Sequence, residues 1–137
     1  MTENIRLEVV TPEKNVVSEE VQIVAAPGTL GEFGVLIRHT PFLTTLKVGS
    51  IRYADIDGKE RYVFVNGGFA ETLPDRVTIL AESAEKRDDI DLERATAAKE
   101  RAEERLAEDR TRDDMDFIRA KAALERAVQR IKLIEIS

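Results

Sequence analysis

The sequence has no cysteine, and its only histidine is His39. Without cysteine the chain has no disulfide, no thiolate metal site and no cysteine nucleophile. A single histidine also rules out a histidine cluster as a metal site. These absences exclude most metal chemistry and most covalent catalysis, so the sequence favours a binding function.

A long hydrophobic run is also missing. The N-terminus, MTENIRLEVV, has no basic region followed by an apolar one, and no stretch approaches the apolar length that crosses a bilayer. We therefore expect a protein of the cytoplasm or of the cytoplasmic face of a membrane. The net charge is −6, with both signs dense throughout. Non-specific binding of nucleic acid or anionic lipid is therefore not expected, and a protein partner or a small ligand fits better.

Glycine and proline are absent from the second part of the chain. All seven glycines and all four prolines lie before residue 85. There, short apolar runs of alternating period are separated by turn signals, as in LTTLKVG, SIRYADI, RYVFVNGG and FAETLPD. This pattern predicts an antiparallel all-β unit over residues 1–84. Residues 85–137 are rich in strong helix formers, and the polar stretch EDRTRDD predicts a turn between two antiparallel helices.

The two predicted helices have different apolar faces. The second has a heptad-like seam, made of Phe117, Ala120, Leu124, Ala127, Ile131 and Ile134. The first has a stripe dominated by alanine, made of Leu92, Ala95, Ala98, Ala102 and Leu106. At about 25 cal/mol per Å2, alanines contribute far less than leucines would. We therefore expect a detachable hairpin, which either leans on the β-domain or lays its seam on another protein.

The stretch RDDIDLERATAAKERA places Asp91 and Arg94 three residues apart where the first helix begins. On spacing alone, they are a helix cap and a surface ion pair worth about 0.2–0.5 kcal/mol. If the chain folds back near residue 110, Arg126 and Arg130 arrive beside them, and Arg101 adds a fourth guanidinium. Such a cluster repels itself unless a ligand such as a polyphosphate neutralises it, and arginine geometry suits that ligand.

A second candidate region is the stretch LGEFGVLIRHTPFLTTL. Its glycines lack the lysine and hydroxyl residue of a phosphate-binding loop, so we expect them to shape a bulged turn. His39 precedes Thr40 and Pro41 at the expected loop tip. No acid or nucleophile is placed beside His39 by the sequence, so a surface contact is favoured over catalysis.

Three stretches, taken in order, resemble the epsilon subunit of bacterial ATP synthase, the counterpart of the mitochondrial delta subunit. They are TPEKNVVSEEVQIVAAPGTLGEFGVLIRHTPFLTTLKVGSIR, VNGGFAETLPDRVTILAESAE and DIDLERATAAKERAEERL. The resemblance spans essentially the whole chain. In one place the chain departs from the family pattern, because it has Ile37 and Arg38 where the family usually has Pro-Gly before the loop histidine.

The resemblance implies a non-catalytic rotor subunit, peripheral on the cytoplasmic face of the bacterial membrane. Its β-sandwich, of about ten strands, is expected to bind the gamma subunit and touch the ring of c subunits. Glu32 and His39 resemble residues that face this ring. The hairpin of such subunits either folds on the sandwich or extends to the beta and alpha subunits, where it inhibits ATP hydrolysis.

The resemblance also implies a nucleotide site. The segment IDLERA matches the Ile/Leu-Asp-x-x-Arg-Ala pattern of epsilon subunits that bind ATP. Adenine contacts are implied for Glu85, Ile90, Asp91, Leu92 and Ala95. Phosphate contacts are expected from Arg94, Arg101, Arg126 and Arg130. ATP is then a regulatory ligand that is not hydrolysed, and no cofactor or metal is required.

Three hypotheses follow from these observations. In the first, the chain regulates the synthase and ATP is its signal. In the second, it is a purely structural coupling subunit, and its arginines only contact acidic partners. The third, an unrelated sandwich enzyme, is disfavoured because the sequence assembles no nucleophile with a base, no metal cluster and no phosphate loop. We expect the isolated chain to be a monomer with its hairpin folded on the sandwich.

Overall fold

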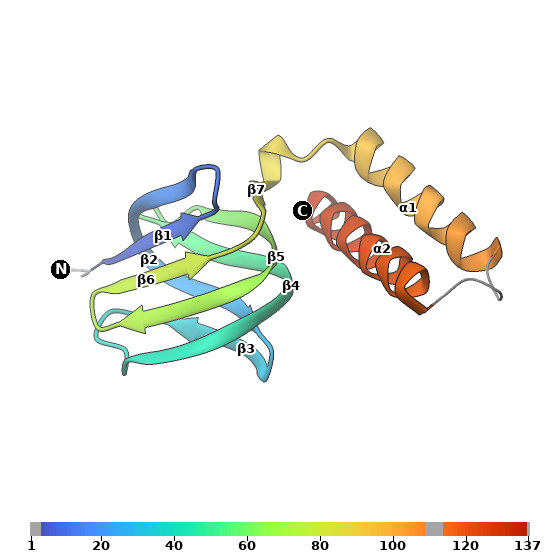
Figure 1. Ribbon diagram of the computed structural model, residues 1–137. Helices are drawn as coiled ribbons and strands as arrows, with labels where there is room; N and C mark the ends of the chain where they lie inside the picture. The colour runs from blue at the N-terminus through green and yellow to red at the C-terminus, as the bar shows by residue number, and fades with distance from the viewer. Residues whose placement is uncertain (1–3, 109–113, 137) are drawn as a thin grey trace. The chain divides into compact units, whose positions relative to one another are not determined.

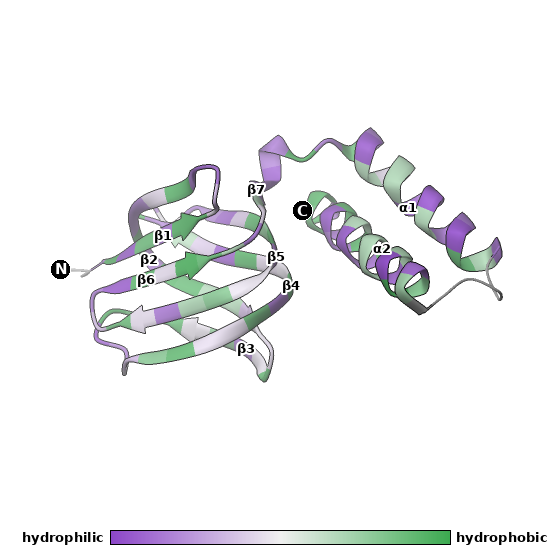
Figure 2. Cartoon of the chain, viewed as in Figure 1, coloured by the Kyte–Doolittle hydropathy of each residue, from purple (hydrophilic) through white to green (hydrophobic). Residues whose placement is uncertain are grey.

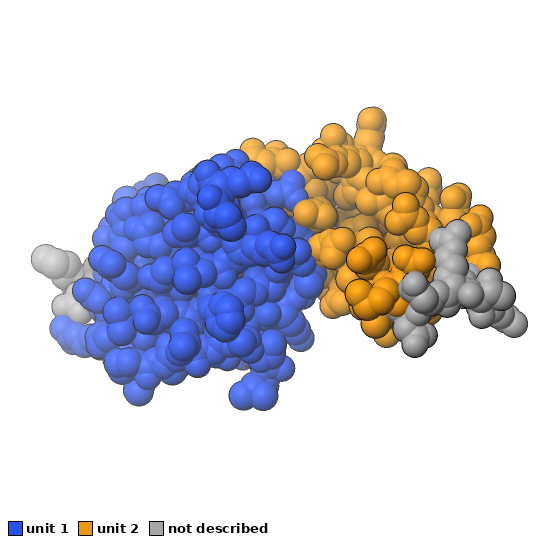
Figure 3. All heavy atoms as spheres, viewed as in Figure 1, with its two compact units in different colours: residues 1–87 blue, residues 88–137 orange. Residues whose placement is uncertain are grey.

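A computed structural model describes residues 4–108 and 114–136 of the chain (Figure 1). The chain forms two compact units, residues 1–87 and residues 88–137 (Figure 3). The first unit therefore extends past the boundary predicted after residue 84. The reason is a short strand, β7 (Ala84–Lys86), which pairs with Val63–Val65 of the sheet and so belongs to the first unit.

The first unit is one seven-stranded sheet that closes on itself. Its other strands are β1 (Ile5–Val10), β2 (Asn15–Gly28), β3 (Gly31–Val35), β4 (Phe42–Asp55), β5 (Glu60–Leu73) and β6 (Arg76–Leu80). The pairing order is β1-β6-β5-β4-β2, and β1 also pairs with β2, which completes the circuit. Figure 1 shows β1 and β6 side by side and parallel, and the other pairs are antiparallel. The predicted class, a β-sandwich domain followed by a two-helix hairpin, is confirmed.

The strand count differs from the prediction of about ten. The described residues hold seven strands, because β2, β4 and β5 are each 14 residues long. Gly49 and the pair Gly67 and Gly68 read as turns in the sequence, but they lie inside β4 and β5. Glycine inside a strand marks a close approach of neighbouring backbone or side chains. A Cβ on Gly49 would lie 3.0 Å from the Cβ of Pro27.

The core follows the alternation of the strands. In β1, Ile5, Leu7 and Val9 are fully buried, whereas the side chains between them are partly exposed. Valine, isoleucine, leucine and alanine from the other strands complete the buried cluster. Because each strand turns every second residue inward, its remaining side chains form the outer face of the unit.

The second unit is a helical hairpin. Its helices are α1 (Leu92–Glu108) and α2 (Asp114–Glu135), and a short 3-10 turn, η1 (Arg87–Asp89), precedes α1. Figure 2 shows hydrophilic and hydrophobic residues interleaved along both helices. The two helices pack on each other.

Alanines form the centre of the helix pair. Ala95 and Ala102 of α1 and Ala120 and Ala127 of α2 are at most 4% exposed. Of the stripe predicted for the first helix, Ala95 and Ala102 are therefore buried, Ala98 and Leu106 are partly exposed, and Leu92 is 47% exposed. Phe117 was predicted to lie in the seam, but it is 46% exposed near the start of α2. Leu133, which was not predicted for the seam, is only 2% exposed.

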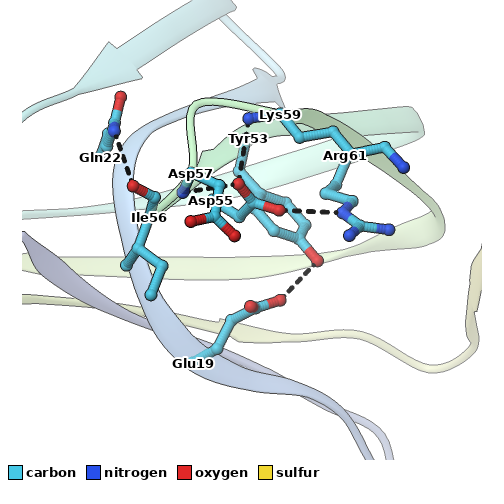
Figure 4. A network of polar contacts seen from close by, with 8 residues as sticks. All are labelled: Glu19, Gln22, Tyr53, Asp55, Ile56, Asp57, Lys59 and Arg61. Carbon is cyan, nitrogen blue, oxygen red and sulfur yellow. Dashed lines mark hydrogen bonds and ion pairs between the residues drawn. The ribbon is translucent and has the colours of Figure 1, made fainter.

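A carboxylate organises the turn between β4 and β5 (Figure 4). The Oδ1 of Asp55 accepts hydrogen bonds from the backbone amides of Asp57 (2.9 Å) and Lys59 (3.0 Å). Its Oδ2 accepts one from the Nε of Arg61 at 3.2 Å. The bond from the Lys59 amide, with help from Arg61, lowers the pKa of Asp55 below its ordinary value.

Replacing Asp55 should change the acid stability of the protein. Because its pKa is lowered in the folded state, the stabilisation by Asp55 is present above the unfolded pKa of about 3.9 and is lost as the pH falls through the folded value. In Asp55→Asn, the free energy of unfolding should therefore decline less between about pH 5 and pH 2. Urea titrations at several pH values measure this decline. The Asp57→Asn variant should behave like the parent, and an unchanged decline in Asp55→Asn would contradict the role of the carboxylate.

Gly68 should not tolerate a larger side chain. Its φ is +124°, and a Cβ there would collide with the carbonyl oxygen of Leu80 on the neighbouring strand. We expect Gly68→Ala to lower the free energy of unfolding by on the order of 3 kcal/mol. Gly58 is the control, since it has a φ of +81° but open space around it. Gly58→Ala should lose only about 1–2 kcal/mol in a denaturant titration, and equal losses would show that the collision is absent.

Candidate functional site

Asp91 caps the first helix. It lies immediately before α1, and its Oδ1 accepts a hydrogen bond from the backbone amide of Arg94 at 3.1 Å. Its carbonyl oxygen accepts the next helical bond, from the amide of Ala95, at 3.0 Å. The carboxylate thus contacts the backbone of Arg94 and satisfies a free amide of the first turn. The guanidinium of Arg94 forms no ion pair within the described part of the chain, and it stays available for a ligand.

The helices of the hairpin have a clear register. A depression of about 590 Å3 is lined by Arg101, Glu104, Arg105 and Glu108 of α1 and by Asp116 and Arg119 of α2. The last turns of α1 therefore lie beside the first turns of α2, as in an antiparallel pair. The buried alanines repeat with the same spacing in both helices. This spacing puts Ala95 level with Ala127, and Ala102 level with Ala120.

Arginines follow one side of this hairpin. Arg94 lies about two helical turns before Arg101 in α1, and Arg126 lies about two turns after Arg119 in α2. Arg94 and Arg126 are therefore on the same helix faces as Arg101 and Arg119, which line the depression. Arg130 lies one turn beyond Arg126. We call the set Arg94, Arg101, Arg119, Arg126 and Arg130 the arginine face. The sequence prediction included all of these except Arg119, which its spacing from Arg126 could have revealed.

The residues expected to contact adenine have diverse surroundings. Leu92 is 47% exposed and Ile90 is partly exposed, whereas Ala95 is only 4% exposed. Glu85 lies in β7 and therefore belongs to the first unit, while the other expected contacts lie in the second.

The loop residues predicted to contact a partner lie on the first unit. Glu32, in β3, has its Oε1 3.6 Å from a guanidinium nitrogen of Arg52, and both side chains are more than half exposed. The Nδ1 of His39 lies 2.8 Å from the carbonyl oxygen of Thr40, so its N–H tautomer donates a hydrogen bond there. The His39 ring also meets the ring of Phe42, with centroids 5.3 Å apart. His39 is thus held as a turn residue that contacts backbone.

The sequence did not predict an apolar row on the outer face of the sheet. Val10 of β1 pairs with Leu80 of β6, and Leu80 pairs with Phe69 of β5. Leu80 and Phe69 are each 53% exposed. We call these three residues the outer apolar row. Beside it lies a depression of about 530 Å3, lined by Val10, Thr11, Pro12, Asn66, Gly68, Phe69, Leu80, Ala81 and Glu82. The alternation of inward and outward residues in β5 could have indicated this surface, because Phe69 falls at an outward position.

Comparison with known proteins identifies the family. The family described as ATP synthase, Delta/Epsilon chain, beta-sandwich domain matches residues 4–87. The chain belongs to the delta/epsilon family of ATP synthase subunits. The long alpha-helix domain of the same family matches residues 88–135. The boundary between these two matches, after residue 87, is the same as the sequence boundary between the two units.

Individual relatives agree with the family. The ATP synthase epsilon chain of Desulfosudis oleivorans is 66% identical over 106 residues, which are 77% of this chain and 80% of the relative. That of Desulforapulum autotrophicum is 68% identical over 108 residues, 79% of this chain and 80% of the relative. A chain in the Euglena gracilis mitochondrial ATP synthase structure, which contains OSCP, F1 and c-ring, superposes with a TM-score of 0.79 at 25% identity, covering 92% of this chain and 78% of its own length.

This delta/epsilon chain is a non-catalytic subunit of the central stalk of ATP synthase. The hypothesis of an unrelated sandwich enzyme is therefore dismissed. Within residues 4–108 and 114–136, no three acidic or histidine side chains are grouped as metal ligands. No helix in that part of the chain is long and apolar enough to span a membrane.

Proposed function

We propose that this delta/epsilon subunit couples the membrane ring to the catalytic head, and that its hairpin regulates ATP hydrolysis. Its partners are then the gamma subunit, the ring of c subunits and, through the hairpin, the beta and alpha subunits. It works as a peripheral protein on the cytoplasmic face of the bacterial membrane. The observation that carries this proposal is the outer apolar row, because it gives the first unit a surface suited to a permanent protein partner.

The energetics of the outer apolar row support docking. A soluble protein that keeps apolar side chains in contact across neighbouring strands usually uses them for binding. Phe69 and Leu80 are about half exposed, so a partner can still bury much of each side chain. Complete burial of such a side chain contributes about 1.5–3 kcal/mol. The adjacent depression offers room for a side chain of the partner, and we assign the gamma subunit to this surface.

A charge in the outer apolar row should weaken docking. In the complex with Phe69→Asp, the gamma subunit would cover a carboxylate that has no opposite charge beside it. The affinity for the gamma subunit should therefore fall at least tenfold, about 1.4 kcal/mol. Calorimetric titration with purified gamma subunit measures this loss. Ile56→Asp is the control, since Ile56 is 59% exposed in the turn after β4 and lies outside the row. If both variants bind like the parent, the row is not the gamma surface.

The alanine interface of the hairpin supports a regulatory role. Alanine side chains bury little apolar area, so α1 and α2 gain little from each other compared with a leucine seam. Two arrangements of such a hairpin then differ by a few kcal/mol, and ligands or partners of ordinary affinity can shift the balance between them. We propose that the hairpin exchanges partners in this way, and so restrains ATP hydrolysis in one arrangement.

We further propose that ATP binds to the hairpin and stabilises one of these arrangements. Glu104, Glu108 and Asp116 share the depression with Arg101 and Arg119, whereas Arg94 and Arg126 lie about two helical turns from that depression. A polyphosphate would bind these two guanidiniums through charge-assisted hydrogen bonds. Asp91 uses Oδ1 to cap the helix, and its second oxygen can accept a bond from the exocyclic amine of adenine. ATP is then a signal that is never hydrolysed. The competing hypothesis is a purely structural subunit whose arginines contact acidic partners.

Removing Arg126 should weaken ATP binding strongly. A charge-assisted hydrogen bond contributes about 1.5–3 kcal/mol, so Arg126→Ala should raise the Kd for ATP by about 10- to 150-fold. Isothermal titration of the full chain gives this value. Lys121→Ala is the matched control, because it removes the same charge from an exposed position on the opposite side of α2. Equal losses in both variants would indicate general charge attraction, and an absence of ATP binding by the parent would favour the purely structural subunit.

A further inference from the structure

The last residue of the first unit is Arg87, and its side chain lies over an aromatic ring. The pairing of β7 with β5 ends at Lys86, opposite Val63, so the next position along each strand brings Arg87 to Tyr62. The Cζ of Arg87 lies 5.6 Å from the centroid of the Tyr62 ring, within the range of a cation–π interaction. A side-chain contact thus continues the strand pairing by one residue.

The strand that Arg87 follows has few attachments of its own. β7 has three residues and pairs only with β5 among the seven described strands. Of its side chains only that of Ala84 is buried in the core cluster. The residue before β7 is held by one backbone bond, from the amide of Asn66 to the carbonyl oxygen of Ser83 at 3.0 Å. A segment with so little burial opens locally, so a contact at its end has a large effect on how often it opens.

Tyr62 is itself held in place. Its hydroxyl donates a hydrogen bond to Oε2 of Glu60 at 3.0 Å, and its backbone pairs with Arg52 of β4. The Tyr62 side chain is also partly buried. The ring is therefore a preformed platform, and little order has to be imposed on it when the guanidinium of Arg87 binds.

We propose that Arg87 and Tyr62 form a clasp that sets the length of the linker to the helical hairpin. With the clasp closed, the linker is limited to residues 88–91, because Asp91 caps α1 and α1 begins at Leu92. With the clasp open and β7 unpaired, residues 84–87 join the linker. These four residues extend its reach by up to about 14 Å.

The consequence for regulation rests on the proposed function, in which the hairpin exchanges partners. A longer linker favours the arrangement that reaches farther from the first unit, and this is the arrangement that restrains ATP hydrolysis. A cation–π contact at a partly exposed position changes the ratio of open to closed states about two- to fivefold. A contact of this strength biases the linker without locking it, as a switch requires.

Amide hydrogen exchange of the full chain, followed by mass spectrometry, measures how often β7 opens. Arg87→Gln and Tyr62→Leu should each speed the exchange of residues 84–87 about two- to fivefold. Their double variant should exchange no faster than either single variant, because both remove the same contact. Tyr62→Phe keeps the ring and should behave like the parent. Lys86→Gln is the matched control, because it removes an equal charge from the exposed neighbouring residue.

The opposite outcomes are distinct. Unchanged exchange of β7 in both Arg87→Gln and Tyr62→Leu would overturn the clasp. Equal acceleration throughout β5 and β6 would also overturn it, because it would show a general loss of stability. Acceleration in Tyr62→Phe would assign the effect to the bond with Glu60 and likewise overturn it.

ATP hydrolysis by the assembled synthase tests the linker role separately. Arg87→Gln should lower the hydrolysis rate, and Lys86→Gln should not. If exchange shows an open clasp in Arg87→Gln but hydrolysis is unchanged, the clasp does not control the hairpin and the inference fails. If the synthase hydrolyses ATP equally with and without this subunit, the proposed regulation fails instead, and the exchange rates alone decide the clasp.

Discussion

The closure of the sheet by β1 is the constraint on which the first unit depends. β1 pairs with β2 on one side and with β6 on the other, so the circuit of strands has no open edge at this point. The amide of Arg6 also donates to the carbonyl oxygen of Asp75 at 3.0 Å, next to the Pro74 that accepts a bond from Arg38. One short strand therefore fixes the position of the outer apolar row and, through the β5–β6 turn, that of the loop between β3 and β4.

The sequence predicts the class of this fold because two periodicities are strong in it. Alternating apolar residues indicate the strands, and the loss of glycine and proline marks the change to helices. Glycine within the strands led to a wrong prediction of turns, because glycine occurs both in tight turns and at close contacts inside strands. Gly68 lies against the Leu80 carbonyl of a neighbouring strand, and only the strand pairing reveals this. That ambiguity is why three long strands read as several short ones.

The candidate sites also differ in how far the sequence predicts them. The arginine face is largely predictable, because helical spacing alone relates Arg94 to Arg101 and an antiparallel turn relates both to Arg126. The outer apolar row was missed, since it needs the register of three strands that are distant in the sequence. The departure at Ile37 and Arg38 was visible in the sequence. The positive φ of Arg38, +67°, was not, because a change of residue type does not by itself give the backbone conformation.

The alanine interface of the hairpin has a consequence for temperature. The heat-capacity change of a conformational transition scales with the apolar area that it exposes, at about 0.45 cal/mol/K per Å2. Separating helices that meet through Ala95, Ala102, Ala120 and Ala127 exposes little such area. Separation of α1 from α2 therefore has a small heat-capacity change, and its free energy varies almost linearly with temperature. The stability of this hairpin has no pronounced optimum temperature, unlike that of a domain with a large apolar core.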